Sequence, residues 1–128
     1  MTQVKDMIDE KLDFALAEQL GWVNAWDGVR LVWLDGKTNE FRRKVTDWHP
    51  STDPAASLEV QAKAIADNKL IYLNALLSLV SPGEDIQFGL GGSMEVVGYN
   101  IDGTSAMVNA SPRERAEAAY ITLQGERT

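Results

Sequence analysis

Apolar residues recur at every fourth position near the start of the chain. Charged side chains, among them Asp9 and Glu18, occupy many of the positions between them. A repeat of this length places one apolar stripe along an α-helix. Gly21 follows the last apolar residue, and glycine readily adopts the left-handed conformation that commonly ends a helix. The pattern predicts an amphipathic helix over Met7–Leu20, whose apolar stripe consists of Ile8, Leu12, Leu16 and Leu20.

In the next part of the chain, side chains follow an alternating pattern typical of β-strands and no longer repeat at every fourth position. It runs over Val29–Leu34 and again over Phe41–Val45, and the turn-forming sequence DGKTN lies between the two runs. Two alternating runs joined by such a turn predict a β-hairpin. The alternation would place Arg42 and Lys44 on one face of the second strand and Arg43 on the other.

Helical spacing returns in two adjacent segments in the middle of the chain. Pro54–Asp67 is rich in alanine, and Lys69–Val80 is more apolar, so we expect it to be more deeply buried. Asn68 lies between them, and the two segments therefore form either one continuous helix or two helices. The sequence SPGED then ends the helical pattern.

The last predicted helix begins with residues typical of a helix N-terminus. Ser111 has the side chain of an N-cap, Pro112 suits the first turn, and Glu114 supplies an early acidic group. We expect its buried stripe to consist of Ala116, Ala119, Tyr120 and Leu123.

Three short segments before this helix have compositions compatible with β-strands. They are Ile86–Leu90, Met94–Tyr99 and Ala106–Val108, and an Asp102-Gly103 pair predicts a turn before the third. The predicted fold is one α+β domain over residues 1–128. In this layered α/β/α sandwich, a mostly antiparallel sheet of about five strands is flanked by three or four helices.

The composition supports a single folded domain and excludes several kinds of functional site. The chain has 128 residues, of which 45% are hydrophobic and 24% charged, values typical of globular proteins. It has no cysteine, which excludes disulfides, thiolate metal sites and a cysteine nucleophile. The chain starts with mixed charges and has no apolar run long enough to span a membrane, so we expect a soluble cytoplasmic protein.

The net charge of −7 indicates which kinds of partner the protein is suited to bind. A negative surface repels phosphate backbones, so nonspecific binding to nucleic acid is disfavoured. The same charge would let the protein imitate DNA toward a basic partner, although an acidic balance ordinarily serves solubility. The apolar segment Leu70–Val80 and four tryptophans offer more apolar surface than a small core needs, which favours a homodimer.

The sequence HPSTDP, His49–Pro54, contains the only histidine of the chain. Pro54 suits the first turn of a helix, and Thr52 or Asp53 can accept hydrogen bonds from its free amides. A hydrolase interpretation would instead make His49 a base that activates Ser51 or Thr52, with Asp47 or Asp53 orienting it. We favour the capped helix start and assign no catalytic residue.

A helix start of this kind also suits an anionic ligand. Its free amides carry partial positive charge, and Trp48 and His49 could stack on a ring. Asp47 and Asp53 oppose a phosphate there unless a basic side chain reaches in from the preceding strand. The predicted ligand-binding residues are Arg42, Arg43, Trp48, His49, Ser51, Thr52 and Asp53.

The other candidate sites for a ligand or a metal have little support in the sequence. GLGGS at Gly89–Ser93 lacks the lysine of a phosphate-binding P-loop and predicts a bend. The spacing of Glu84, Asp85 and Asp102 matches no calcium loop, so we assign no metal and no cofactor. The four tryptophans are expected to fill the core rather than line a pocket.

Three segments resemble a known family. LDFALAEQLGW at Leu12–Trp22, HPSTDPAASLEV at His49–Val60 and the C-terminal RAEAAYITL are similar to the signatures of the phage ABA sandwich domain family. The sequence departs from that pattern at the apolar helical segment Lys69–Val80, where the second helix would lead straight into a strand.

The resemblance implies a small phage or prophage protein with helices on both sides of a sheet. The family has no established general activity, and small phage domains of this kind often counter host defence or bind a host factor. We therefore expect a non-enzymatic accessory protein that binds a small anionic ligand such as a nucleotide signal. The alternative is a protein-binding inhibitor or interaction module, acting on a host protein as an acidic mimic.

Overall fold

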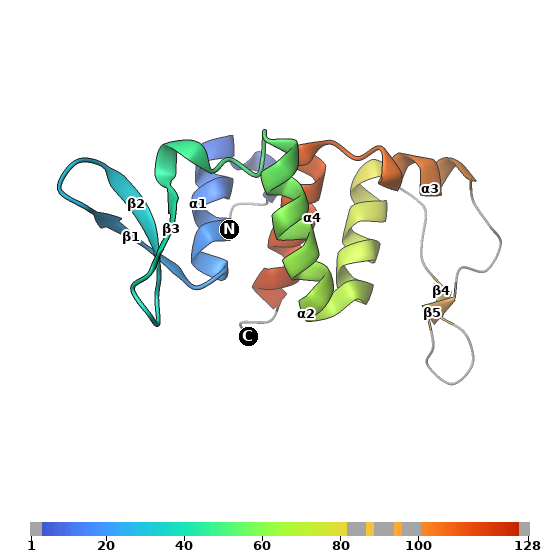
Figure 1. The fold of residues 1–128 in the computed structure, drawn as a ribbon. Coiled ribbons are helices and arrows are strands. Elements are labelled where there is room, and N and C mark those ends of the chain that lie inside the picture. Colours follow the sequence, from blue (N-terminus) through green and yellow to red (C-terminus); the bar gives the residue numbers. More distant parts are fainter. Residues whose placement is uncertain (1–3, 82–86, 89–93, 96–100, 126–128) are drawn as a thin grey trace.

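The computed structural model describes residues 4–81, 87–88, 94–95 and 101–125 (Figure 1). The helices are α1 (Asp9–Gln19), α2 (Pro54–Val80), α3 (Ile101–Val108) and α4 (Pro112–Gly125), with short 3-10 turns at Val4–Asp6 and Val45–Asp47. The strands are β1 (Trp22–Trp26), β2 (Leu31–Asp35), β3 (Phe41–Lys44), β4 (Gln87–Phe88) and β5 (Met94–Glu95).

The first helix, α1, forms where the four-residue repeat predicted it. Leu12 and Leu16 are fully buried, and Gly21 has a φ of 85°, the left-handed conformation predicted for the residue that follows the helix. Ile8 lies before the first turn and is exposed, so the stripe is shorter than expected. Asp13 is a charged residue of α1, but it is buried and does not belong to the solvent-exposed face of the helix.

Strands β1, β2 and β3 form one antiparallel sheet in that order. The predicted hairpin is confirmed as β2 and β3. Strand β1 was not predicted, and it pairs with β2 from Trp22 opposite Asp35 to Trp26 opposite Leu31. Gly36 lies so close to the start of this sheet that a Cβ atom there would sit 2.5 Å from the carbonyl oxygen of Gly21.

A β-bulge changes the direction of the arginines. Trp33 pairs with Arg43, but the next residue, Leu34, pairs with Phe41, so Arg42 is an extra residue on β3. A bulge re-aims side chains because it breaks the alternation of the strand. The prediction that Arg42 and Arg43 point to opposite faces is therefore wrong, since both line the same cleft.

Helix α2 consists of two arms that meet at Asn68. This residue has non-helical angles, φ −160° and ψ 90°, and its side-chain oxygen accepts a hydrogen bond from the amide of Ile71 at 3.2 Å. The Tyr72 hydroxyl reaches back to Gln61, where it donates to Oε1 at 2.7 Å. Figure 1 shows the arms, residues 54–67 and 69–80, side by side, so two helices form.

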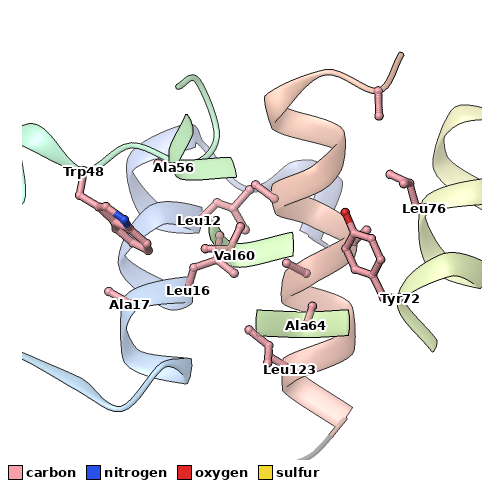
Figure 2. Close-up of a cluster of buried hydrophobic side chains, with 14 of the residues drawn as sticks. Leu12, Leu16, Ala17, Trp48, Ala56, Val60, Ala64, Tyr72, Leu76 and Leu123 are labelled. Carbon is pink, nitrogen blue, oxygen red and sulfur yellow. The ribbon is translucent and has the colours of Figure 1, made fainter. Parts of the chain in front are cut away.

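The core lies between α1, both arms of α2 and α4 (Figure 2). Ala116, Ala118 and Ala119 are fully buried, and side chains this small allow α4 to approach α2 closely. The predicted cap of α4 is confirmed: Ser111 Oγ accepts from the Glu114 amide at 3.1 Å, and Glu114 accepts from the Ser111 amide at 2.9 Å. The core side chains include Leu12, Leu16, Trp33, Trp48, Val60, Ala64, Tyr72, Leu76 and Leu123.

Predictions for the second half of the chain are less accurate. The predicted strand Ala106–Val108 is wrong, because these residues belong to α3, as does the Asp102-Gly103 pair predicted as a turn. Gly103 is buried and Met107 packs on the core, so tertiary packing outweighs the local preference. Strands β4 and β5 pair with each other at Phe88 and Met94 in a separate sheet, within two of the predicted segments.

The structure is α+β, as predicted, with an antiparallel sheet. The five-stranded layered sandwich is not confirmed. Figure 1 shows β1 to β3 at one end of the row of helices. No helix within the described ranges is both long and apolar enough to cross a membrane.

Candidate functional site

A cleft of about 570 Å³ lies between the three-stranded sheet and the first arm of α2. The sheet contributes Trp22, Asp35 and both arginines of β3, and the helix contributes Glu59 and Lys63. Small side chains on α2 leave the space open, because Ala62 and Ala66 also line it. The cleft therefore combines three cationic side chains, two carboxylates and one large ring.

Arg42 is held on one wall by Asp35. Its Nη2 lies 2.7 Å from Asp35 Oδ2, while Asp35 Oδ1 accepts from the amides of Lys37 at 2.8 Å and Thr38 at 2.9 Å. The hydrogen bond from Arg42, followed by those from the two amides, holds the pKa of Asp35 far below its usual range. Arg42 Nε is buried and has no hydrogen-bond partner among the residues described.

Arg43 is linked to the core through Glu59. Its Nη2 lies 2.8 Å from Glu59 Oε2, and the other oxygen of Glu59 accepts from the Trp48 indole at 2.9 Å. Trp48 is only 3% exposed, and its ring centroid lies 4.8 Å from that of Trp22. Trp48 therefore serves as a buried support behind the cleft, with its ring packed in the core.

Lys63 follows Glu59 by one helical turn and lines the same cleft. No ion pair to Lys63 is present in the part of the chain that the structure describes, and its side chain is exposed. Arg42 and Arg43 are each matched by a carboxylate, so Lys63 supplies the unmatched positive charge. The electrostatic balance of the cleft favours an anion in spite of the net negative chain.

The HPSTDP segment is a capped helix start, as predicted. Asp53 Oδ2 accepts from the Ala56 amide at 3.3 Å, and Pro54 is the first residue of α2. Thr52 is exposed, whereas Ser51 is buried and its amide donates to Asp13 Oδ1 at 2.9 Å. The segment is thus tied to α1 as well as to its own helix.

Asp13 and His49 form a contact that sequence reasoning missed. Asp13 Oδ2 lies 3.5 Å from His49 Nδ1, and the other ring nitrogen, Nε2, is 2.8 Å from the carbonyl oxygen of Thr46. Burial raises the pKa of the Asp13 carboxyl, and the Ser51 amide and His49 partly oppose this effect. Nε2 of His49 is engaged by the Thr46 carbonyl, and no side-chain hydrogen bond joins His49 to Ser51 or Thr52 in the part of the chain that the structure describes.

The structure thus divides the seven predicted ligand-binding residues between separate places. Arg42 and Arg43 share the cleft, Trp48 lies behind it, and the remaining four lie around the start of α2. Sequence reasoning missed Trp22, Glu59 and Lys63. The last two were detectable as charged residues four positions apart beside alanines on a helix, a spacing that places them on one face.

Two other features of the sequence have no part in this site. The GLGGS segment lies outside the residues that the structure describes. In the described ranges, no cluster of three or more His, Asp or Glu side chains is arranged to hold a metal ion.

Comparison of the chain with protein-family models, curated proteins and solved structures finds no match in any of the three. The resemblance to the phage ABA sandwich domain family therefore stays a prediction.

Proposed function

We propose that this protein binds a small anionic ligand, such as a nucleotide, in the cleft between its sheet and α2, without catalysing a reaction. The observation that carries the proposal is the convergence of Arg42, Arg43 and Lys63 on one open space. Guanidinium groups recognise phosphate and carboxylate through paired hydrogen bonds, and lysine adds a point charge.

The size and lining of the cleft support a ligand with a ring. A volume of about 570 Å³ falls within the range of roughly 300–1,000 Å³ typical of small-molecule sites. Trp22 supplies an aromatic surface in the same cleft, against which a base can pack. The anionic part would then meet the arginines and the ring would meet the tryptophan.

Binding requires an exchange of partners at the arginines. Asp35 and Glu59 occupy Arg42 and Arg43 in the free protein, and an exposed ion pair such as Arg43–Glu59 is worth only about 0–1 kcal/mol. A phosphate that binds both guanidinium groups and Lys63 therefore replaces weak contacts by a denser set. The resemblance implies a phage protein. In that setting, we propose a small accessory protein that captures a nucleotide signal of host defence.

A thermal-shift panel of inorganic phosphate, linear nucleotides and cyclic nucleotides tests this proposal. A ligand at a hundred times its dissociation constant adds about 2.7 kcal/mol, which corresponds to roughly 10 °C for a domain of this size. Lys63→Gln should reduce the shift without altering the melting temperature of the free protein, whereas Lys11→Gln, on the exposed face of α1, should leave it unchanged. A panel without any shift contradicts the proposal.

A second candidate, protein interaction, is favoured by the tip of the β1–β2 hairpin. Trp26 is 65% exposed and Val29 69% exposed, and Figure 1 shows this hairpin pointing away from the helices. Exposed apolar groups of this size mark interaction surfaces when they are contiguous, and Trp26 and Leu31 are register partners. Sedimentation velocity over a concentration series, compared with Trp26→Ser, tests the homodimer. An unchanging monomer in both proteins contradicts it.

A further inference from the structure

A second, smaller pocket of about 120 Å³ lies on the other side of Trp48. Three aromatic side chains line it, Phe14 from α1, Trp33 from β2 and Trp48 from the segment before α2. The acidic residues Glu10 and Asp13 line the same space, together with His49. The surface of this pocket is nearly all apolar and aromatic, with the two acidic residues at its edge, whereas charged side chains line the larger cleft.

Aromatic rings form the walls of the pocket. The ring centroids of Phe14 and Trp33 lie 4.9 Å apart with an interplanar angle of 67°, so the two rings form a corner rather than a stack. Trp33 and Trp48 are 2% and 3% exposed, so Phe14, at 38%, is the most accessible ring of the pocket. Aromatic rings attract cations through the negative potential of their π faces.

The acidic residues come from the same face of α1 as Phe14. Glu10, Asp13 and Phe14 are spaced at i, i+3 and i+4, so they share one face of α1. The oxygens of Asp13 are engaged by Ser51 and His49, which leaves Glu10 as the carboxylate that can turn toward a ligand. Glu10 is exposed and takes part in no ion pair with any other described residue. Asp13 is buried, and its 3.5 Å contact with His49 is long for a salt bridge.

We propose that this pocket binds a small alkylated ammonium group, such as the head group of choline or the side chain of trimethyllysine. The volume is well below the roughly 300 Å³ of ordinary ligand sites, so it accommodates one compact group only. Aromatic rings accompanied by acidic side chains are suited to quaternary ammonium groups, since these cations gain from the π faces and do not need hydrogen bonds.

The test uses two probes of the same shape that differ in charge. Choline chloride and neutral 3,3-dimethyl-1-butanol are titrated into the ¹⁵N-labelled full chain at constant ionic strength, and the indole NH resonances are followed. We expect saturable shifts with choline and binding of the neutral alcohol weaker by roughly tenfold. Equal binding of both probes, or no saturable shift with choline, overturns the proposal.

Variants then locate the site. Phe14→Leu keeps an apolar side chain but removes the ring, so choline affinity should fall by roughly tenfold, while Phe41→Leu, at an exposed ring on β3, should leave it unchanged. Phe14 is 38% exposed, and the exposed Glu10→Gln provides an independent test that leaves the core intact. Choline affinity that is the same in Phe14→Leu, Glu10→Gln and the unaltered protein overturns the assignment.

A parallel titration with trimethyllysine identifies the source of the cation. Tighter binding of trimethyllysine than of choline points to a protein side chain, and the reverse order points to a free choline-type ligand. Both results support an ammonium site. These titrations involve none of the cationic residues of the cleft, so they succeed or fail independently of anion binding there.

Discussion

Asp13 offers the sharpest test of how the loop before α2 is held. The carboxylate is 5% exposed and accepts the amide of Ser51, which is itself buried. Asp13→Ala leaves that amide without an acceptor, and a buried unsatisfied donor costs about 1–3 kcal/mol. The contact with the half-exposed His49 adds at most about 1 kcal/mol. Relief of the buried charge offsets part of this loss.

Asp13→Asn is the matched variant. Its carbonyl oxygen can still accept the Ser51 amide, and its neutral amide does not incur the desolvation that raises the pKa of Asp13. We expect Asp13→Asn to be near wild-type stability at pH 7 and Asp13→Ala to be less stable by about 2 kcal/mol, or roughly 6–10 °C in melting temperature. Urea denaturation of the three proteins measures the difference. Equal losses in both variants would refute the role assigned to the Ser51 amide.

The pH dependence has a definite sign. The folded pKa of Asp13 lies above its unfolded value of 3.8, so the folded state binds this proton more tightly. The stability contributed by the protonated group is fully present below pH 3.8 and is lost as the pH rises through the folded pKa. The stability of Asp13→Asn relative to the wild type should therefore increase from pH 4 upward. A constant difference across this range would contradict a raised pKa.

Three further substitutions test other parts of the structure. Ser111→Ala should cost about 1 kcal/mol in urea denaturation, because it removes the acceptor of the Glu114 amide. Gly36→Ala should cost about 1–3 kcal/mol, since its Cβ would lie 2.5 Å from a backbone oxygen, while Gly125→Ala, with open space around it, should not. Glu59→Gln removes the carboxylate that competes for Arg43, so calorimetry should detect tighter phosphate binding than in Glu10→Gln, at an exposed position on α1.

The features that were predicted correctly are those set by residues close together in the sequence. The ends of helices are set by residues within one turn, and Gly21, Asp53 and Ser111 all behave as expected at those positions. The break at Asn68, one of the two alternatives that the sequence left open, occurs because its side chain can cap the second arm of α2. Each of these features depends on hydrogen bonds between residues fewer than five positions apart.

Features that depend on distant partners were missed. Strand β1 pairs with β2 across a turn in which Asp27 Oδ1 accepts the amides of Val29 and Arg30 and Gly28 has a φ of 102°. The Asp-Gly pair at 27–28 was a readable turn signal, but the five-residue strand before it was too short to be predicted alone. Segment 101–108 is helical through its contacts with α2, which no local pattern records.

The candidate cleft was partly predictable for the same reason. Arg42 and Arg43 were correctly selected as cationic residues near α2, but alternation separated them and only the bulge brings them together. Lys63 and Glu59 reach the cleft because the first arm of α2 forms the wall opposite the sheet. The buried carboxylate of Asp13 was unpredictable, since its acceptor role depends on an amide 38 positions away.

Trp48 contacts both candidate sites. Its indole NH donates to Glu59 in the arginine-lined cleft, and its ring lines the smaller aromatic pocket. Replacing Trp48 would damage the core and both pockets at once, so its loss would identify neither ligand. Lys63 and Phe14 each line a single pocket and are exposed, which makes them the residues whose substitution can distinguish an anion site from a cation site.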